Sequence, residues 1–291
     1  MRADRVIGVD LGGTKILAGV VDADGRVHET VERPTVTTSQ AALLDELEQA
    51  VRSLPLDGIA AVGFGVPSRI DQHTGVALGA VNIPLREVHF GDEMHRRLDL
   101  RIGVENDASC AAYAEFRHGA GRGVQNFVML TLGTGVGGGV VAGGGLFHAW
   151  TELGHMVIVE DGEPCYGACS GRGHVEAYCS GRAADKIAQR VLGADATARD
   201  LVREQHPVLQ QIGHHLGVAM GSLVNIFGAQ RIVIGGGFGV AAFDLLLPSA
   251  RLAVLTEALA PAGQELEIAA AQLGATAGLI GAGLVAFEAL G

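Results

Sequence analysis

Residues Arg5–Lys15 read RVIGVDLGGTK, a short β-rich run that ends at an aspartate and turns through two glycines. A second apolar run, Ile16–Val21, follows directly. The order of strand, glycine turn and strand returns about 120 residues later in Phe127–Val141 (FVMLTLGTGVGGGVV). Either two lobes share one plan, or the chain contains two unrelated glycine-rich hairpins. The repeat favours two related lobes.

The first glycine turn carries side chains that suit a phosphate group. Asp10, Thr14 and Lys15 supply a carboxylate, a hydroxyl and an ammonium group beside the amides of Gly12 and Gly13. Glycines permit positive φ angles, and successive open backbone amides bind anions. An ordinary hairpin turn is the alternative when this turn is considered alone. Two such turns facing each other would hold a phosphate chain between them.

Length, composition and charge exclude several classes of protein. The chain has 291 residues, of which 48% are hydrophobic, so it can bury a sizeable core and is not disordered. A formal net charge of −11, without a run of Lys and Arg, opposes nucleic-acid binding. The first residues lack the apolar core of a signal peptide, and four cysteines in so long a chain are no disulfide scaffold. We therefore expect a protein of the reducing cytoplasm.

A membrane helix is the alternative interpretation of Phe127–Thr151, which lacks Asp, Glu, Lys and Arg and contains a G-x-x-x-G spacing over Gly135–Gly139. Glycines are frequent in this window, and each costs roughly 1 kcal/mol in a helix interior relative to alanine. The glycine clusters favour turns between short strands. We therefore expect no membrane partner.

Apolar periodicity predicts the remaining helices and strands. The first thirty residues are expected to form a three-stranded meander whose third strand covers 26–32. Further strands are expected over 59–66, 101–105 and 231–234. Helices are expected over 41–54, 91–98, 108–118, 208–227, 252–259 and 275–290, and another is expected to start near Val240.

Two of the expected strands end in residues with functional potential. Asn106 and Asp107 follow one strand and precede a helix, where a carboxylate is either an N-cap or a catalytic base at the carboxyl end of a strand. Gly235–Gly237 follow another strand. They either let a flat ligand approach the backbone closely or form a plain strand-to-helix turn.

A third group of residues combines sulfur and imidazole side chains. Ten residues separate the positions of His155 and Cys165, four separate Cys165 from Cys169, and five separate Cys169 from His174. This spacing is typical of a closed tetrahedral zinc site, and an unmetallated loop is the alternative. Cys179 is either a substitute ligand or a buried structural cysteine.

In this order and spacing, the motifs resemble those of the ROK family of sugar kinases and sugar-responsive repressors, most closely its bacterial glucokinase-like members. The resemblance covers nearly the whole chain and implies an α/β fold similar to actin and hexokinase (ribonuclease H-like), with two lobes closing over a cleft. The smaller N-terminal lobe would comprise residues 1–108 plus about 277–291, and the larger lobe residues 109–276. The motifs that carry the resemblance are Asp10–Lys15, Glu105–Ala108, Leu132–Gly139, Glu152-x-Gly154-His155, the Cys/His segment with Glu176, and Ile234–Gly237.

The resemblance implies ATP-dependent phosphorylation of a hexose, most closely glucose, at its 6-hydroxyl, with Asp107 as the general base. Phosphoryl transfer needs amide donors and a metal for the nucleotide, and one carboxylate for the proton of the attacking hydroxyl. The implied ligands of Mg-ATP are Asp10, Gly12, Gly13, Thr14, Lys15, Gly133, Thr134 and Gly135 at the phosphates, and Gly235, Gly236 and Gly237 at the adenosine. The implied sugar ligands are Ser68, Asn82, Asn106, Asp107, Glu152, His155 and Glu176, and the implied ligands of a structural Zn²⁺ are His155, Cys165, Cys169 and His174.

The Cys/His segment departs from the commoner family pattern, in which Cys-x-Cys is followed after four residues by a third cysteine. Here Cys165-x-x-x-Cys169 precedes His174, and histidine is an acceptable zinc ligand. Three roles stay open for His155: a zinc ligand, a sugar contact through its other ring nitrogen, or both.

The resemblance also leaves alternatives for the function. Kinases for N-acetylglucosamine, N-acetylmannosamine, mannose and fructose share these motifs, and polyphosphate replaces ATP in related enzymes. Family members are homodimers or homotetramers. The non-enzymatic alternative is a sugar-sensing regulator, which would carry a helix-turn-helix domain before the first strand, whereas that strand is expected to begin at Arg5 here.

Overall fold

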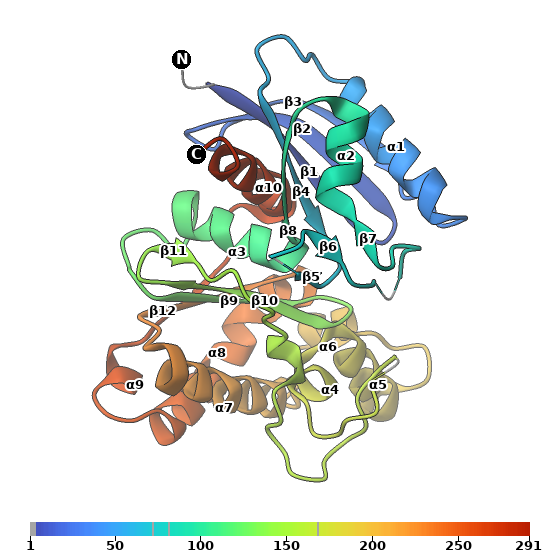
Figure 1. The fold of residues 1–291 in the computed structure, drawn as a ribbon. Helices are drawn as coiled ribbons and strands as arrows, with labels where there is room; N and C mark the ends of the chain where they lie inside the picture. Colours follow the sequence, from blue (N-terminus) through green and yellow to red (C-terminus); the bar gives the residue numbers. More distant parts are fainter. Residues whose placement is uncertain (1–3, 72, 81, 168) are drawn as a thin grey trace. The chain divides into compact units, whose positions relative to one another are not determined.

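The computed structural model describes residues 4–71, 73–80, 82–167 and 169–291 (Figure 1). The chain forms two compact units. The first comprises Met1–His118, His148–Trp150 and Ala275–Gly291, and the second comprises Gly119–Phe147 and Thr151–Gly274.

The first unit is built on a five-stranded sheet with the order β3-β2-β1-β4-β8. An antiparallel meander of β1 (Arg5–Leu11), β2 (Lys15–Asp22) and β3 (Val27–Pro34) is extended by β4 (Ala61–Val66) and β8 (Arg101–Asn106), which run parallel to β1. The predicted meander is therefore confirmed. Every residue of β4 is buried, as expected for a strand covered on both faces.

Helices cover both faces of this sheet (Figure 1). On one face α1 (Gln40–Arg52) and α2 (Phe90–Leu98) share a core with the sheet. On the other face lies α10 (Ala277–Glu288), which also packs against α3 (Asp107–His118). A small separate sheet is formed by three strands of two residues each: β5 (Ile70–Asp71), β6 (Val76–Ala77) and β7 (Val88–His89).

A row of glycines lets α10 lie directly on the backbone of the sheet. Gly19, Gly8, Gly63 and Gly103 are consecutive partners across β2, β1, β4 and β8. A Cβ atom at Gly63 would overlap the carbonyl oxygen of Ala282 in α10, and one at Gly103 would lie 2.6 Å from a second α10 carbonyl. The row is thus a groove that any larger residue would fill, which explains the absence of side chains along this line.

The second unit repeats the plan of the first. Its sheet order is β11-β10-β9-β12-β13, in which β9 (Phe127–Leu132) and β10 (Val136–Ala142) pair antiparallel and β12 (Arg231–Gly235) runs parallel to β9. The short β11 (Gly145–Leu146) and β13 (Glu267–Ala270) form its edges. The repeat predicted from the two glycine turns is confirmed, and the membrane helix considered for Phe127–Thr151 is excluded because that segment contains paired strands.

Two long helices of the second unit pack along each other: α7 (Leu209–Phe227) and α8 (Gly237–Glu257). Length and composition alone would allow α8 to cross a membrane, but it contributes Phe238, Leu246 and Val254 to the core of this unit. The shorter helical segments are η1 (Leu153–His155), α4 (Val175–Cys179), α5 (Gly181–Leu192), α6 (Ala198–Arg203), α9 (Ala262–Glu265) and η2 (Gly274–Thr276).

One prediction about this region is wrong. Separate helices were expected near Val240 and over 252–259, whereas α8 runs without interruption from Gly237 to Glu257 through Pro248. Packing explains the difference, because α7 brings Gly213 and Gly217 against the backbone of α8 and holds it along its length. The expected division of the chain at residue 108 stays a prediction. In the structure α3 is part of the first compact unit, where it packs against α10.

Candidate functional site

The first unit places two carboxylates at the same edge of its sheet. Asp10 lies near the end of β1, where its backbone neighbour in β4 is Gly65, and Gly65 is in turn paired with Glu105 of β8. Asp107 begins α3 directly after β8, and a Cβ atom at Gly65 would lie 3.5 Å from its Cα atom. Burial and the charge of Asp107 raise the pKa of Asp10 to about 6, with Lys15 acting in the opposite direction. Asp10 and Asp107 are therefore electrostatically coupled.

Asn106 caps the helix that Asp107 begins. Its Oδ1 atom accepts hydrogen bonds from the backbone N–H groups of Ala108 and Ser109, at 2.9 and 3.1 Å. The N-cap role that was considered for Asp107 therefore belongs to its neighbour. Asp107 itself accepts a 2.8 Å hydrogen bond from the N–H of Ala108. Its position in the first turn places its carboxylate at the electropositive amino-terminal end of α3.

Two weaker sugar-ligand candidates lie in loops around this edge. Ser68 is buried, and its hydroxyl donates to the carbonyl oxygen of Gly79 at 3.0 Å. The carbonyl oxygen of Ser68 accepts from the side-chain amide of Asn106 at 3.4 Å. Asn82 lies beside the first glycine turn, since a Cβ atom at Gly13 would be 3.7 Å from its Cβ atom. The Ser68 hydroxyl thus has a structural partner within the loop.

The first glycine turn is closed by its own backbone. The N–H of Gly12 donates to the carbonyl oxygen of Lys15 at 2.9 Å, and the hydroxyl of Thr35 donates to the carbonyl oxygen of Gly12 at 2.7 Å. The ammonium group of Lys15 forms an exposed ion pair with Glu32 at 2.8 Å, which raises the pKa of Lys15. In this conformation the Lys15 ammonium group is bound to Glu32 of β3.

In the second unit, the second glycine turn packs against Glu176. The carboxylate of Glu176 accepts a 2.9 Å hydrogen bond from the N–H of Val136, and a side chain at Gly135 would overlap the Glu176 carboxylate. The N–H of Gly181, at the start of α5, donates to the carbonyl oxygen of Gly133 at 2.7 Å. Gly135 is therefore required at this position by the close approach of Glu176.

The glycines after β12 have different structural reasons. Gly236 has a φ angle of 79°, and a side chain there would lie 2.5 Å from the carbonyl oxygen of Leu132. A side chain at Gly237 would meet nothing within 4 Å. Gly236 is thus needed for the turn itself, whereas the backbone at Gly237 is open to a ligand.

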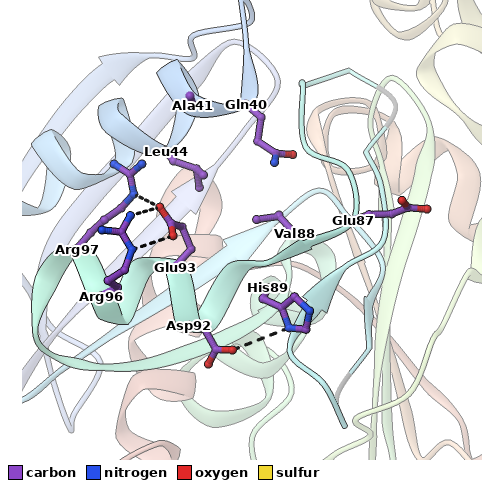
Figure 2. Close-up of a pocket in the computed structure, with 10 residues that line it drawn as sticks. All are labelled: Gln40, Ala41, Leu44, Glu87, Val88, His89, Asp92, Glu93, Arg96 and Arg97. Atoms are coloured by element: carbon purple, nitrogen blue, oxygen red, sulfur yellow. Dashed lines mark hydrogen bonds and ion pairs between the residues drawn. The ribbon is translucent and has the colours of Figure 1, made fainter.

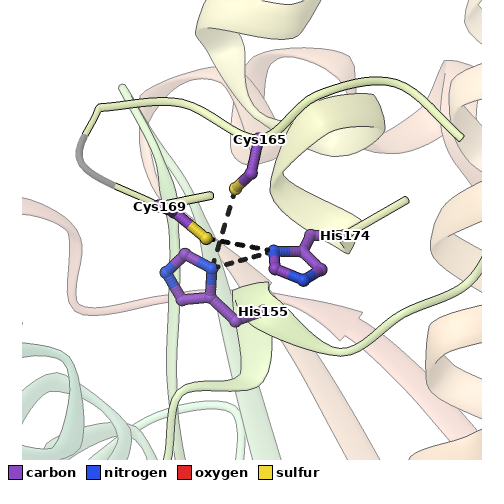
Figure 3. A group of neighbouring side chains, drawn as sticks. All are labelled: His155, Cys165, Cys169 and His174. Carbon is purple, nitrogen blue, oxygen red and sulfur yellow. Dashed lines mark hydrogen bonds between the residues drawn. The ribbon is translucent and has the colours of Figure 1, made fainter. Parts of the chain in front are cut away.

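The four predicted metal ligands come together in the second unit (Figure 3). Their ligand atoms all lie within 4.8 Å of one another. The Sγ atom of Cys165 is 3.7 Å from Nδ1 of His155, and the Sγ atom of Cys169 is 3.6 Å from Nδ1 of His174. Zn–S bonds of about 2.3 Å and Zn–N bonds of about 2.0 Å require tetrahedral edges of roughly 3.3–3.8 Å. The sulfur-to-nitrogen distances fit that geometry.

Cys179 lies apart from this cluster. Its side chain is fully buried, and its thiol donates a weak hydrogen bond to the carbonyl oxygen of Ile212 at 3.7 Å. Burial raises the pKa of the Cys179 thiol, so it stays protonated. The alternative of Cys179 as a substitute metal ligand is therefore not supported, and it is a core residue.

The comparison with known proteins decides the family. Residues 6–289 match the ROK family. The chain belongs to the ROK family. It is 32% identical to a glucokinase of Streptomyces coelicolor, over 97% of both chains.

Solved ROK structures are similar over the whole chain. A ROK family glucokinase from Streptomyces griseus, in complex with glucose and AMPPNP, has a TM-score of 0.82 and 32% identity, covering 98% of this chain and 99% of that one. The ROK hexokinase from Thermus thermophilus has a TM-score of 0.85 and 30% identity, with the same coverage. The predicted two-lobed, actin- and hexokinase-like α/β fold is thereby confirmed.

One pocket of this ROK protein lies away from the motifs. A surface pocket of 480 Å³ lies between α1, α2 and the segment before α2 (Figure 2). Arg96 and Arg97 on its wall are both bonded to Glu93, and His89 lies 3.9 Å from Asp92. None of the predicted site residues lines it. Both arginines of this pocket are therefore already held by a carboxylate of the protein.

One residue pair near the motifs was not predicted. Glu105 is only 4% exposed, and an oxygen of its carboxylate lies 2.9 Å from Nδ1 of His148. The available signal was a carboxylate that follows Ile102–Val104 in a predicted strand, because buried carboxylates require partners. The identity of that partner, 43 positions away, could not be read from the sequence.

Proposed function

We propose that the protein transfers the terminal phosphoryl group of ATP to the 6-hydroxyl of glucose. The observation that carries the proposal is its 32% identity, over nearly the full chain, to a ROK glucokinase whose structure contains glucose and AMPPNP. A hexose and an adenine nucleotide are the pair of ligands that this reaction needs.

Asp107 is assigned the role of general base. A carboxylate directly after β8 and in the electropositive first turn of α3 is a suitable acceptor for the proton of the sugar hydroxyl. Asn106 is fixed by its capping hydrogen bonds and offers the remaining amide atoms to sugar hydroxyls. The other proposed sugar ligands are Ser68, Asn82, Glu152, His155 and Glu176.

The two glycine turns and the glycines after β12 are assigned to Mg-ATP. Backbone amides at such turns suit phosphate oxygens, and Asp10 is a carboxylate that can act on a bound Mg²⁺ through its charge or a water. The open backbone at Gly237 suits the adenosine. The proposed nucleotide ligands are Asp10, Gly12, Gly13, Thr14, Lys15, Gly133, Thr134, Gly135, Gly235, Gly236 and Gly237.

A structural zinc ion is proposed at His155, Cys165, Cys169 and His174. The distances between their ligand atoms suit a tetrahedral ion, which would supply a rigid cross-link rather than reaction chemistry. His174 precedes Glu176 by two residues, and Glu152 precedes His155 by three. A cross-link at the two histidines would therefore restrict both of these glutamates. With Nδ1 of His155 turned to the other metal ligands, its Nε2 atom is the one available to a sugar.

We further propose that the enzyme acts in the cytoplasm as a homodimer or homotetramer. Its four cysteines are all free thiols, as is usual in a reducing compartment, and a dimer or tetramer is what the family resemblance implies.

A coupled assay of ADP release across a sugar panel tests the proposed function. Glucose, mannose, fructose, N-acetylglucosamine and N-acetylmannosamine would each be offered with ATP and, separately, by product analysis, with polyphosphate. The proposal expects the highest kcat/KM for glucose with ATP. A preference for an N-acetylhexosamine would assign another kinase of the family. Glucose binding without turnover on any sugar would instead support a sugar-sensing regulator.

A further inference from the structure

Three residues of the chain pack with the first unit although their neighbours on both sides belong to the second. His148–Trp150 belong to the first unit, whereas Phe147 and Thr151 belong to the second. We call His148–Trp150 the strap. Glu152, a proposed sugar ligand, follows the strap by two residues.

His148 joins the strap to the strand that leads into the proposed base. Its Nδ1 atom lies 2.9 Å from Oε2 of Glu105, and its Nε2 atom lies 3.7 Å from a carboxylate oxygen of Glu288. The other oxygen of Glu105, Oε1, accepts a 2.8 Å hydrogen bond from the backbone N–H of Asn106. One buried carboxylate therefore connects the imidazole of His148 to the backbone that leads into Asp107.

Trp150 provides a second anchor for the strap. The guanidinium carbon of Arg69 lies 4.3 Å from the centre of the Trp150 ring, within the range of a cation–π interaction. Arg69 follows Ser68, whose carbonyl oxygen accepts a hydrogen bond from Asn106. Both anchors thus reach residues that adjoin the proposed sugar ligands of the first unit.

The surroundings of His148 favour its protonated form. The hydrogen bond to Glu105 raises the pKa of His148, partial burial opposes this, and the charges of Glu105 and Glu288 raise it further. Behind Glu288, the hydroxyl of Tyr113 donates to its carboxylate at 2.7 Å, and Arg117 donates to that hydroxyl at 3.3 Å. His148 and Glu288 border a pocket of 290 Å³ whose other lining residues are glycines and apolar residues.

An exposed ion pair of this kind would ordinarily contribute little. This one differs because the Glu105 side chain is only 6% exposed, whereas that of His148 is 44% exposed. Removing the imidazole would take away a partner of this buried carboxylate and allow it to turn. Such a rotation would disturb the hydrogen bond that the backbone N–H of Asn106 donates to Glu105.

We propose that His148 is a positioning residue for phosphoryl transfer: as an imidazolium it orients the Glu105 carboxylate, which in turn holds the Asn106–Asp107 backbone in place. His148 does not itself touch the reacting atoms in this proposal. The activity test of this inference rests on the proposed kinase function. The fluorescence test rests only on the contacts of the strap.

The activity test compares His148→Asn and His148→Ala with a matched control. The Asn side chain can keep a donor towards Glu105 but carries no charge, whereas Ala keeps neither. His28→Gln is the control, because His28 also pairs with an aspartate, Asp22, at 2.8 Å within the first unit but far in sequence from the strap. Displacements of a base by about 1 Å can cost up to 100-fold in rate, so we expect kcat to fall roughly 10- to 100-fold in His148→Ala and less in His148→Asn.

The pH profile separates positioning from simple loss of structure. Wild-type kcat should fall at alkaline pH as the His148 imidazolium loses its proton, and this limb should be missing in both His148 variants. The KM for ATP should change little, both variants should remain folded at the assay temperature, and His28→Gln should keep the wild-type profile. A His148→Asn variant with wild-type kcat and an unchanged alkaline limb would overturn the proposal. So would a loss of kcat in both variants that is matched by a loss of folded protein.

Trp150 gives a readout that needs no turnover. It is the one tryptophan of the chain and lies two residues after His148, so its fluorescence reports on the strap. Wild-type emission should change across the same pH interval as the alkaline limb, and His148→Asn should abolish that step. If no sugar is phosphorylated but the step is present and His148-dependent, the proposed function fails while the strap contact stands. A wild-type titration without any His148-dependent step would refute the strap inference itself.

Discussion

The Nδ1 atoms of His155 and His174 lie 3.1 Å apart, each facing a cysteine sulfur. Four donors in such a group are expected to bind zinc, and structural zinc binding is coupled to folding. We therefore expect about one zinc ion per chain by elemental analysis, and a lower thermal midpoint after chelation.

Cysteine variants provide the matched pair for this prediction. Cys169→Ser should lose zinc, whereas Cys179→Ala should keep full zinc content while losing some stability through its cavity, since Cys179 is buried outside the cluster. Fully active protein that contains no zinc would disprove the metal assignment.

Asp107→Asn should lower kcat by roughly 100- to 10,000-fold, the range of general-base catalysis, while glucose binding measured by calorimetry stays nearly unchanged. The amide keeps the size of the side chain but cannot accept the hydroxyl proton. Asp92→Asn is the control, because Asp92 is highly exposed on α2. Near-normal turnover of Asp107→Asn would remove this residue from the role of base.

Asp10→Asn should separate stability from activity. The pKa of Asp10 is raised from 3.8 to about 6 in the folded protein, chiefly by burial and then by Asp107. The folded state therefore binds a proton more tightly than the unfolded state, and the stability linked to this proton is present below pH 4 and lost as the pH rises through 6. A shift of about two units corresponds to roughly 3 kcal/mol.

Because the amide has no charge to desolvate, Asp10→Asn should unfold at higher urea concentration than the wild type at pH 8, and the difference should shrink towards pH 4. Its kinase activity should nevertheless fall, as expected for a nucleotide ligand. Equal urea midpoints of the two proteins at every pH would show that folding does not raise the pKa of Asp10.

Gly63→Ala should strongly destabilise the first unit. The added Cβ atom would overlap the backbone of α10 at Ala282, and neither backbone can move without disturbing the sheet or the helix. A loss of at least 1–3 kcal/mol, the usual cost of overpacking, is expected in urea unfolding. Gly91→Ala is the control and should raise the stability slightly. Gly91 lies in α2, an added Cβ atom there would be 3.9 Å from its nearest neighbour, and alanine is the better helix former. Equal stability of the two variants would contradict the packing described for the glycine row.

Much of the fold and the metal cluster could be predicted from local sequence patterns. The meander, its repeat and the helices α1 and α7 follow from short-range periodicity and from glycine turns, which act within a few residues. The four metal ligands were found because their spacing is itself local. The continuous helix α8 was not predicted, because its packing on α7, which accommodates Pro248, depends on contacts that no local pattern reveals.

Two features near the predicted base were missed, one local and one long-range. Asn106, rather than Asp107, caps α3, and this depends on the backbone geometry at the end of β8. Glu105 pairs with His148, which lies 43 positions away, and neither segment contains a motif that points to the other. Such pairs become visible only when tertiary structure brings them together.

The glycine row has a consequence for how the protein is made. The groove it forms on the first sheet is filled by α10, which lies more than 170 residues after β8 along the chain. A ribosome therefore releases the strands of the first unit long before it produces the helix that covers them. During that interval the exposed sheet face is a natural site for chaperones, whereas the second unit, continuous apart from the strap, can fold while synthesis is still under way.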